Sequence, residues 1–173
     1  MPDSDPYQTL GLPVSFDLDP QAVERAYLAR VASVHPDLGS GLPDDEVLSE
    51  AAELNRARQT LLNPETRALA LLRILGHTAE DRSLPDGFLM EMMEVRTDLE
   101  QTQSSGDTAR LGHWRRWASE QRHAWTERIG ALFREHAQTP GPGPLAEIRR
   151  ALNAWRYIER MLEQVGPERD PPR

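Results

Sequence analysis

His35 and Asp37, separated by Pro36, are the side chains of this chain whose types and spacing best suit chemistry. An imidazole beside a carboxylate can act as a general base, as part of a metal site or as a contact for another macromolecule. Catalysis would also require a nucleophile and an orienting group, and the nearby sequence offers neither beyond the pair itself. The pair therefore indicates a binding contact, with a metal-dependent hydrolase as the enzymatic rival.

Other chemistry has little support in the sequence. The chain contains no cysteine, which excludes disulfides, cysteine nucleophiles and thiolate metal sites within it. Its serines show no nucleophile elbow, and no Gly-rich loop is followed by a lysine. The remaining histidines lack a metal-ligand spacing and are predicted to be surface residues: His77, His113, His123 and His136. We expect no metal, no cofactor and no catalytic residue, so the chain is not predicted to be an enzyme.

Two stretches of helical periodicity, residues 20–34 and 44–62, flank the His35-Pro36-Asp37 tripeptide. Proline lacks an N–H donor and clashes with the preceding helical turn, so the first helix is expected to end near Val34. The two helices are predicted to pack as an antiparallel hairpin with the tripeptide on its exposed tip. A short helix from Asp5 to Gly11 and another from residue 64 to Gly76 are expected to cover the hairpin.

The C-terminal half is predicted to form a bundle of three longer helices. They span residues 88–103, 107–136 and 145–165, and short turns at 104–107 and 139–144 make neighbours antiparallel. No alternating pattern typical of strands occurs, so the fold class is all-α. The expected organisation is an N-terminal domain over 1–76, a linker over 77–84, the bundle over 85–166 and a disordered tail over 167–173.

The helix beginning at Phe88 carries more apolar residues than one core-facing stripe requires. Its stripe is Phe88, Met92, Val95 and Leu99. Leu89, Met90 and Met93 point elsewhere, because an α-helix turns by about 100° per residue. Methionine adapts its shape to a partner, so these residues favour a docking surface. Packing of the N-terminal half on the same face is the alternative.

The chain has a net charge of -8, which disfavours binding to nucleic acid. Arginines near Trp114, Trp117 and Trp125 could form a basic aromatic patch, but a solvated arginine face opposite a Trp-rich core stripe is the favoured interpretation. No apolar run is long enough for a membrane span, and the acidic N-terminus does not have the pattern of a signal peptide. An intracellular, cytoplasmic location is expected.

Several motifs together resemble a J-domain, and in particular the HscB subfamily of J-domain co-chaperones. They are Tyr7-Gln8-Thr9-Leu10-Gly11-Leu12, His35-Pro36-Asp37, Leu54-Asn55 with Thr60-Leu61, Pro64-Glu65-Thr66-Arg67-Ala68 with Leu71-Leu72, and Phe88-Leu89-Met90-Glu91 with Glu94-Val95-Arg96. The resemblance extends over residues 7–165. It implies a J-domain followed by a C-terminal three-helix domain.

The resemblance also implies a function and the residues that perform it. An HscB-type protein stimulates ATP hydrolysis by an HscA- or DnaK-type chaperone and delivers the iron–sulfur scaffold protein IscU to it, as a monomer. The implied chaperone-binding residues are His35, Pro36 and Asp37, together with the basic residues Arg25 and Arg30. The implied scaffold-binding residues are Leu89, Met90, Met93, Glu94, Arg96 and Tyr157.

The sequence departs from the family pattern in its charges. Arg25 and Arg30 are the only basic residues of the second helix, which is usually basic in J-domains, and Leu38 stands where a lysine commonly follows the tripeptide. Weaker electrostatic steering toward a chaperone follows. Two alternatives remain: a J-domain protein for another client with the bundle as a dimerisation element, and a J-like protein that activates no chaperone.

Overall fold

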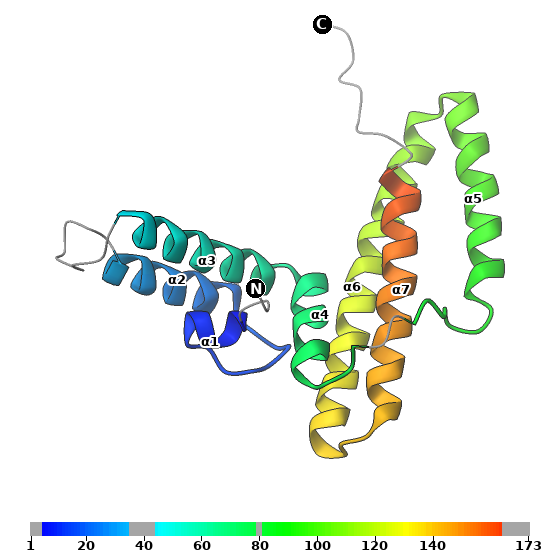
Figure 1. Ribbon diagram of the computed structural model, residues 1–173. Helices are drawn as coiled ribbons and strands as arrows, with labels where there is room; N and C mark the ends of the chain where they lie inside the picture. The colour runs from blue at the N-terminus through cyan, green and yellow to red at the C-terminus, as the bar shows by residue number, and fades with distance from the viewer. Residues whose placement is uncertain (1–4, 35–43, 79–80, 164–173) are drawn as a thin grey trace, which may run out of the picture. The chain divides into compact units, whose positions relative to one another are not determined.

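The computed structural model describes residues 5–34, 44–78 and 81–163, which contain seven α-helices and no β-strand (Figure 1). The all-α class is therefore confirmed. The chain divides into two compact units, Met1–Ala79 and Glu80–Arg173, and each has a hydrophobic core of its own. The tail predicted to be disordered, residues 167–173, lies outside the described residues. None of the described helices combines enough length and apolar character to span a bilayer.

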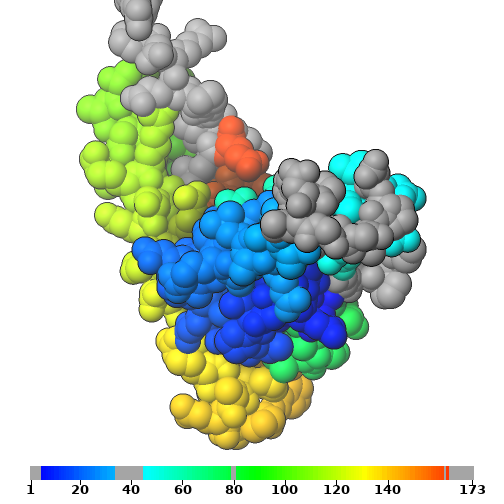
Figure 2. Space-filling view, turned by 90° about the vertical axis from the view of Figure 1, so that its left-hand side faces the viewer, coloured from blue at the N-terminus to red at the C-terminus, as the bar shows by residue number. Residues whose placement is uncertain are grey.

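The N-terminal unit is a helical hairpin with two flanking helices. Its elements are α1 (Pro6–Leu10), α2 (Pro20–Val34), α3 (Asp44–Leu62) and α4 (Pro64–Ile74). Helices α2 and α3 run side by side in opposite directions, and α1 packs against both of them (Figure 1). In the space-filling view the side chains of α1 and α2, coloured blue, form one continuous surface (Figure 2).

Two of these helices begin with a proline that directly follows a polar N-cap residue. The Asp5 carboxylate accepts hydrogen bonds from the backbone N–H groups of Tyr7 at 2.9 Å and Gln8 at 3.4 Å, ahead of α1. The Asn63 side chain does the same ahead of α4, where Pro64 follows it. Proline fits here because the first-turn N–H groups have no intrahelical acceptor.

Tyr7 lies at the centre of the N-terminal core. Its side chain is fully buried with Val23 and Leu61, and its hydroxyl donates a hydrogen bond of 3.0 Å to the carbonyl oxygen of Ser15. Burial raises the pKa of Tyr7 to about 12, although the positive charge of Arg67 opposes the rise. Helix α1 therefore contributes buried side chains to the hairpin core rather than only covering it.

The C-terminal unit is built from α5 (Phe88–Ser105), α6 (Thr108–Gln138) and α7 (Pro142–Glu163). Helices α6 and α7 are antiparallel and pack side by side, and α5 lies beside them (Figure 1). The predicted turn over 139–144 is partly wrong, since α7 already begins at Pro142. Proline is compatible with the first helical turn, so this proline-rich segment starts the helix that it was predicted to precede.

Aromatic and ionic contacts join the three helices of the bundle. The Phe88 ring meets the Trp125 ring edge-on at a centroid distance of 6.1 Å, which links α5 to α6. Arg122 on α6 donates two hydrogen bonds, of 2.6 and 2.8 Å, to the Glu159 carboxylate on α7. These hydrogen bonds lower the pKa of Glu159. The helix carrying the predicted docking face is therefore fixed at its N-terminal end by a buried aromatic ring.

We expect Leu61→Ala to lower the free energy of unfolding by about 2–5 kcal/mol, because Leu61 is fully buried and its truncation leaves a cavity. Leu48→Ala on the same helix is the matched control, since Leu48 is 72% exposed and its truncation should change stability by less than about 0.5 kcal/mol. Urea denaturation followed by circular dichroism measures both. Equal effects of the two substitutions would contradict the assignment of the core.

Candidate functional site

The predicted chaperone-activating tripeptide, His35-Pro36-Asp37, lies outside the described residues. The described helices on either side of it are α2, which ends at Val34, and α3, which begins at Asp44. These boundaries agree with the helices predicted from the sequence. The role of the three residues stays a prediction that rests on the motif and on the helical hairpin that carries it.

A bidentate ion pair connects the two helices of this hairpin. Arg58 on α3 donates hydrogen bonds of 2.8 and 2.6 Å to the two carboxylate oxygens of Glu24 on α2. The same guanidinium group lies over the Tyr27 ring, 5.1 Å from its centroid. The hydrogen bonds from Arg58 lower the pKa of Glu24, because they favour its charged form. The pairing and the cation–π contact fix the two helices against each other.

The two basic residues predicted to contact a chaperone, Arg25 and Arg30, are both exposed on α2. Arg25 forms an ion pair with Asp19 at 3.5 Å, and both side chains are largely solvent-exposed. Arg30 lies against Gly11, where a β-carbon would stand 2.7 Å from its Nη2 atom. Gly11 has a φ of 68°, in the left-handed region, so replacing it by a residue with a side chain would also strain the backbone. The positive charge of Arg25 is thus partly engaged within its own unit.

The apolar residues predicted to be surplus on α5 are exposed within the C-terminal unit. Leu89 is 52%, Met90 73% and Met93 64% exposed. The residues predicted to face the core are buried in the same helix: Phe88, Met92 and Leu99, with Val95 half-buried. The sequence therefore predicted correctly which side of α5 enters the core. The exposed side is the arrangement that a docking surface requires.

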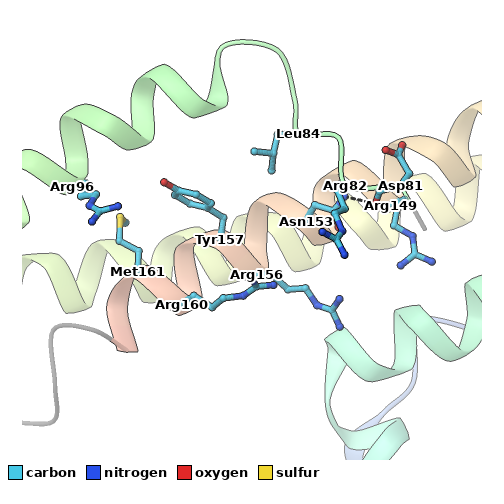
Figure 3. Close-up of a pocket in the computed structure, with 10 residues that line it drawn as sticks. All are labelled: Asp81, Arg82, Leu84, Arg96, Arg149, Asn153, Arg156, Tyr157, Arg160 and Met161. Carbon is cyan, nitrogen blue, oxygen red and sulfur yellow. Dashed lines mark hydrogen bonds between the residues drawn. The ribbon is translucent and has the colours of Figure 1, made fainter. Parts of the chain in front are cut away.

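Tyr157 on α7 and Arg96 on α5 extend this surface toward the neighbouring helix. The half-buried Tyr157 ring packs edge-on against Phe88 at a centroid distance of 5.8 Å. Arg96 forms an ion pair of 2.9 Å with Glu100, whose hydrogen bond and charge raise the pKa of Arg96. Figure 3 shows the Arg96 and Tyr157 side chains between the two helices. The resemblance, rather than periodicity, placed Tyr157 in this set.

The predicted scaffold-binding residues of α5 occupy two adjoining faces of the helix. At about 100° per residue, Arg96, Leu89 and Met93 stand about 80°, 100° and 140° from Phe88. Met90 and Glu94 stand about 200° and 240° from it, on the other side of the helix, and Met90 lies nearly opposite Phe88. Glu94 is exposed. We define the α5 face as the five predicted scaffold-binding residues of α5 together with the adjoining Tyr157 of α7. Its members are Leu89, Met90, Met93, Glu94, Arg96 and Tyr157.

Two other candidate sites were considered from the sequence: a metal site and a basic aromatic patch. No cluster of three potential metal-binding side chains occurs in the described ranges. Trp114 is buried in the core of the bundle, with Trp117 and Trp125 packed against the same cluster. The Trp-rich stripe is therefore part of the core, as was predicted from the sequence.

A row of arginines on α7 was not among the functional residues predicted from the sequence. Arg149, Arg156 and Arg160 are spaced by seven and four residues, which places them on one face of a helix. This spacing was visible in the sequence, but its companions Arg82 and Arg96 come from other segments and join the row only in the fold.

Comparisons with known proteins agree with this architecture. A family model described as the HSCB C-terminal oligomerisation domain matches residues 84–166. A co-chaperone protein HscB homolog of Bordetella petrii is 27% identical over 171 residues, which cover 95% of this chain and 96% of that protein. Another, from Aliivibrio salmonicida, is 39% identical over 107 residues, which cover 58% of this chain and 63% of that relative.

A solved structure extends the similarity to the complete fold. The crystal structure of the human co-chaperone protein HscB is similar with a TM-score of 0.74, and the match covers 95% of this chain and 82% of that one. At 22% sequence identity, this likeness concerns the fold. It bears out the predicted order of a J-like unit followed by a helical C-terminal unit.

We expect Glu24→Gln to lower the free energy of unfolding at neutral pH, because it removes the charged partner of Arg58. The folded-state pKa of Glu24 lies below its ordinary value of 4.5, so its contribution is present above that value and is lost as the pH falls through the lowered pKa. Urea denaturation at a series of pH values measures this. The difference between wild type and variant should shrink in acid.

Glu50→Gln on the solvent-exposed side of α3 is the control, since Glu50 is exposed. It should leave the free energy of unfolding unchanged to within about 0.5 kcal/mol. A loss of stability in Glu24→Gln that persists undiminished in acid would contradict an ionic origin of the contact.

Proposed function

This chain is a protein of the HscB co-chaperone type, and we propose that it couples two partners in iron–sulfur cluster assembly. One partner is an HscA- or DnaK-type chaperone ATPase, which the N-terminal unit would stimulate. The other is an IscU-type scaffold protein, which the C-terminal unit would hold and deliver. The chain acts in this proposal through binding, with no chemical step of its own.

The observation that carries the proposal is the exposed α5 face. Met90 and Met93 are largely solvent-exposed on a helix whose opposite side is buried through Phe88 and Met92. A helix that was only structural would not need these apolar side chains on its outer side. Apolar side chains next to Glu94 and Arg96 suit the surface of a folded protein, which offers apolar contacts surrounded by polar ones.

Stimulation of ATP hydrolysis requires differential binding. The His35-Pro36-Asp37 tripeptide would bind a chaperone conformation poised for hydrolysis more tightly than the resting one, because only a difference in affinity can shift that equilibrium. The second unit would meanwhile raise the local concentration of the scaffold protein near the chaperone. The second effect requires that the two binding sites be in one chain.

A second candidate function uses the same surface for self-association. The matching family model is described as an oligomerisation domain, and residues 84–166 contain the whole α5 face. In this alternative, two copies of the chain bury Met90 and Met93 against each other. Sedimentation of the purified protein separates the candidates, since the proposed function expects a monomer and this alternative a dimer that Met90→Ala with Met93→Ala dissociates.

We expect His35→Gln to reduce the stimulated ATPase rate to the basal rate of the chaperone, because the variant lacks the imidazole of the proposed activating tripeptide. The measurement is steady-state ATP hydrolysis by the purified chaperone with wild-type or variant protein. His123→Gln is the control, because His123 is an exposed residue of α6 in the other unit. Equal stimulation by wild type and His35→Gln would contradict the J-domain assignment.

We expect Met90→Ala with Met93→Ala to weaken binding of the scaffold protein about 10- to 100-fold, since the two truncations together are expected to cost about 1.4–2.8 kcal/mol of binding free energy. Isothermal titration calorimetry with an IscU-type protein measures the affinity. Chaperone stimulation should survive in this variant. The control is Leu48→Ala, which removes an exposed apolar side chain from the N-terminal unit. Unchanged scaffold affinity in the double variant would place the docking site elsewhere.

A further inference from the structure

The C-terminal unit contains an arginine-lined groove that the proposed function does not explain. The groove has a volume of about 730 Å³ and lies between α5, α7 and the segment before α5 (Figure 3). Its only acidic lining residue is Asp81. Its arginines are Arg82, Arg96, Arg149, Arg156 and Arg160. In a chain of net charge -8, such a concentration of positive charge is a local feature and not a reflection of composition.

The wall of the groove is held by specific hydrogen bonds. The Asn153 side-chain amide on α7 donates to the carbonyl oxygens of Asp81 at 2.8 Å and Ser83 at 2.9 Å. The Asp81 carboxylate in turn accepts hydrogen bonds from the backbone N–H and the hydroxyl of Ser83, at 2.8 and 2.7 Å. These contacts tie the segment that carries Arg82 to α7, which carries Arg149, Arg156 and Arg160. The groove is therefore a defined part of the fold.

The groove already accommodates one carboxylate. The hydrogen bonds from Ser83 are the main cause of the lowered pKa of Asp81, and the positive charges of Arg150 and Arg149 lower it further. Of these two arginines, Arg149 lines the groove, and its positive charge favours the charged form of this carboxylate. Arg82 and Arg160 are exposed and form no ion pair or hydrogen bond with the described residues, so they can pair with a ligand.

The groove also has an apolar part and a definite length. Leu84, Tyr157 and Met161 contribute apolar surface between the arginines. Arg149 and Arg160 are eleven positions apart on α7, which corresponds to about 16 Å at 1.5 Å per residue. About five residues of extended chain span the same distance. Its shape and lining therefore suit a short extended peptide with acidic side chains and an apolar one among them.

We propose that this groove binds an acidic extended segment of the protein that the α5 face holds. The proposal rests on the proposed function for the identity of that partner. Arg96 and Tyr157 belong to both surfaces, so one client can contact them together. Guanidinium groups bind carboxylates through paired N–H donors, which gives the contact directional specificity. The apolar α5 face would supply affinity, and the groove would select clients by charge.

A protein carboxylate fits the groove better than a nucleic acid does. Nucleic-acid binding draws on a broad positive field, and this chain is acidic overall. The groove has one aromatic residue, Tyr157, rather than a series of rings for successive bases. The contribution of Leu84 and Met161 matches an apolar side chain of a peptide instead.

The test measures two kinds of binding by the full chain. Arg82→Glu and Arg160→Glu, separately and together, are compared with the wild type and with the control Arg116→Glu, which reverses an exposed arginine on α6. Titration calorimetry measures binding of an IscU-type scaffold protein at several salt concentrations. Fluorescence polarisation measures binding of a labelled peptide of alternating glutamate and leucine and of its glutamine counterpart.

We expect each groove variant to weaken the binding of the acidic peptide and of the scaffold protein by about tenfold, and the double variant by more. Salt should weaken binding to the wild type more than to the double variant. Arg116→Glu should behave as the wild type, and the glutamine peptide should not bind. Equal binding of both peptides, or no effect of the groove variants, overturns the proposal.

The outcomes also separate this proposal from the function on which it rests. If scaffold binding depends on Met90 and Met93 but not on Arg82 and Arg160, the groove proposal fails and the proposed function stands. If the wild type binds no scaffold protein, the proposed function fails, and the groove proposal fails with it because its partner is the protein that the α5 face holds. Binding of inorganic tripolyphosphate in place of the acidic peptide would assign the groove to a phosphate ligand and overturn the proposal.

Discussion

An α-helix turns by about 100° per residue, and this geometry governs the surface of α5. Phe88 and Met92 enter the core of the bundle, where Phe88 contacts aromatic rings of both other helices. With these two fixed, Met90 and Met93 must point away from the core. The docking face is therefore a consequence of how α5 is anchored. A rotation of the helix that hid the methionines would expose Phe88.

The two units of the chain present surfaces of contrasting chemistry. The N-terminal unit is acidic, with six arginines against twelve acidic residues in 1–79, and one of its two α2 arginines, Arg25, is partly engaged by Asp19. The C-terminal unit instead gathers five arginines in one groove beside an apolar helix face. Steering by charge is thus expected to matter more for the client than for the chaperone.

Local signals in the sequence predicted the helices well, because they act within one turn. Asp19-Pro20 and Asn63-Pro64 mark helix starts that the structure confirms, and periodicity identified the buried side of α5. The start of α7 was missed because Pro142 and Pro144 also fit a turn. The arginine groove could not be predicted, since Arg82 and Arg149 are distant in sequence and line one groove only in the fold, where Asn153 on α7 binds the segment that carries Arg82.

The central claim is that one copy of the chain holds a chaperone and a client at the same time. Analytical ultracentrifugation of the labelled chain with an ATP-bound HscA- or DnaK-type chaperone and an IscU-type scaffold protein tests it most directly. We expect a ternary complex that contains one copy of each protein. Only binary complexes, with the scaffold protein displacing the chaperone from the chain, would contradict it.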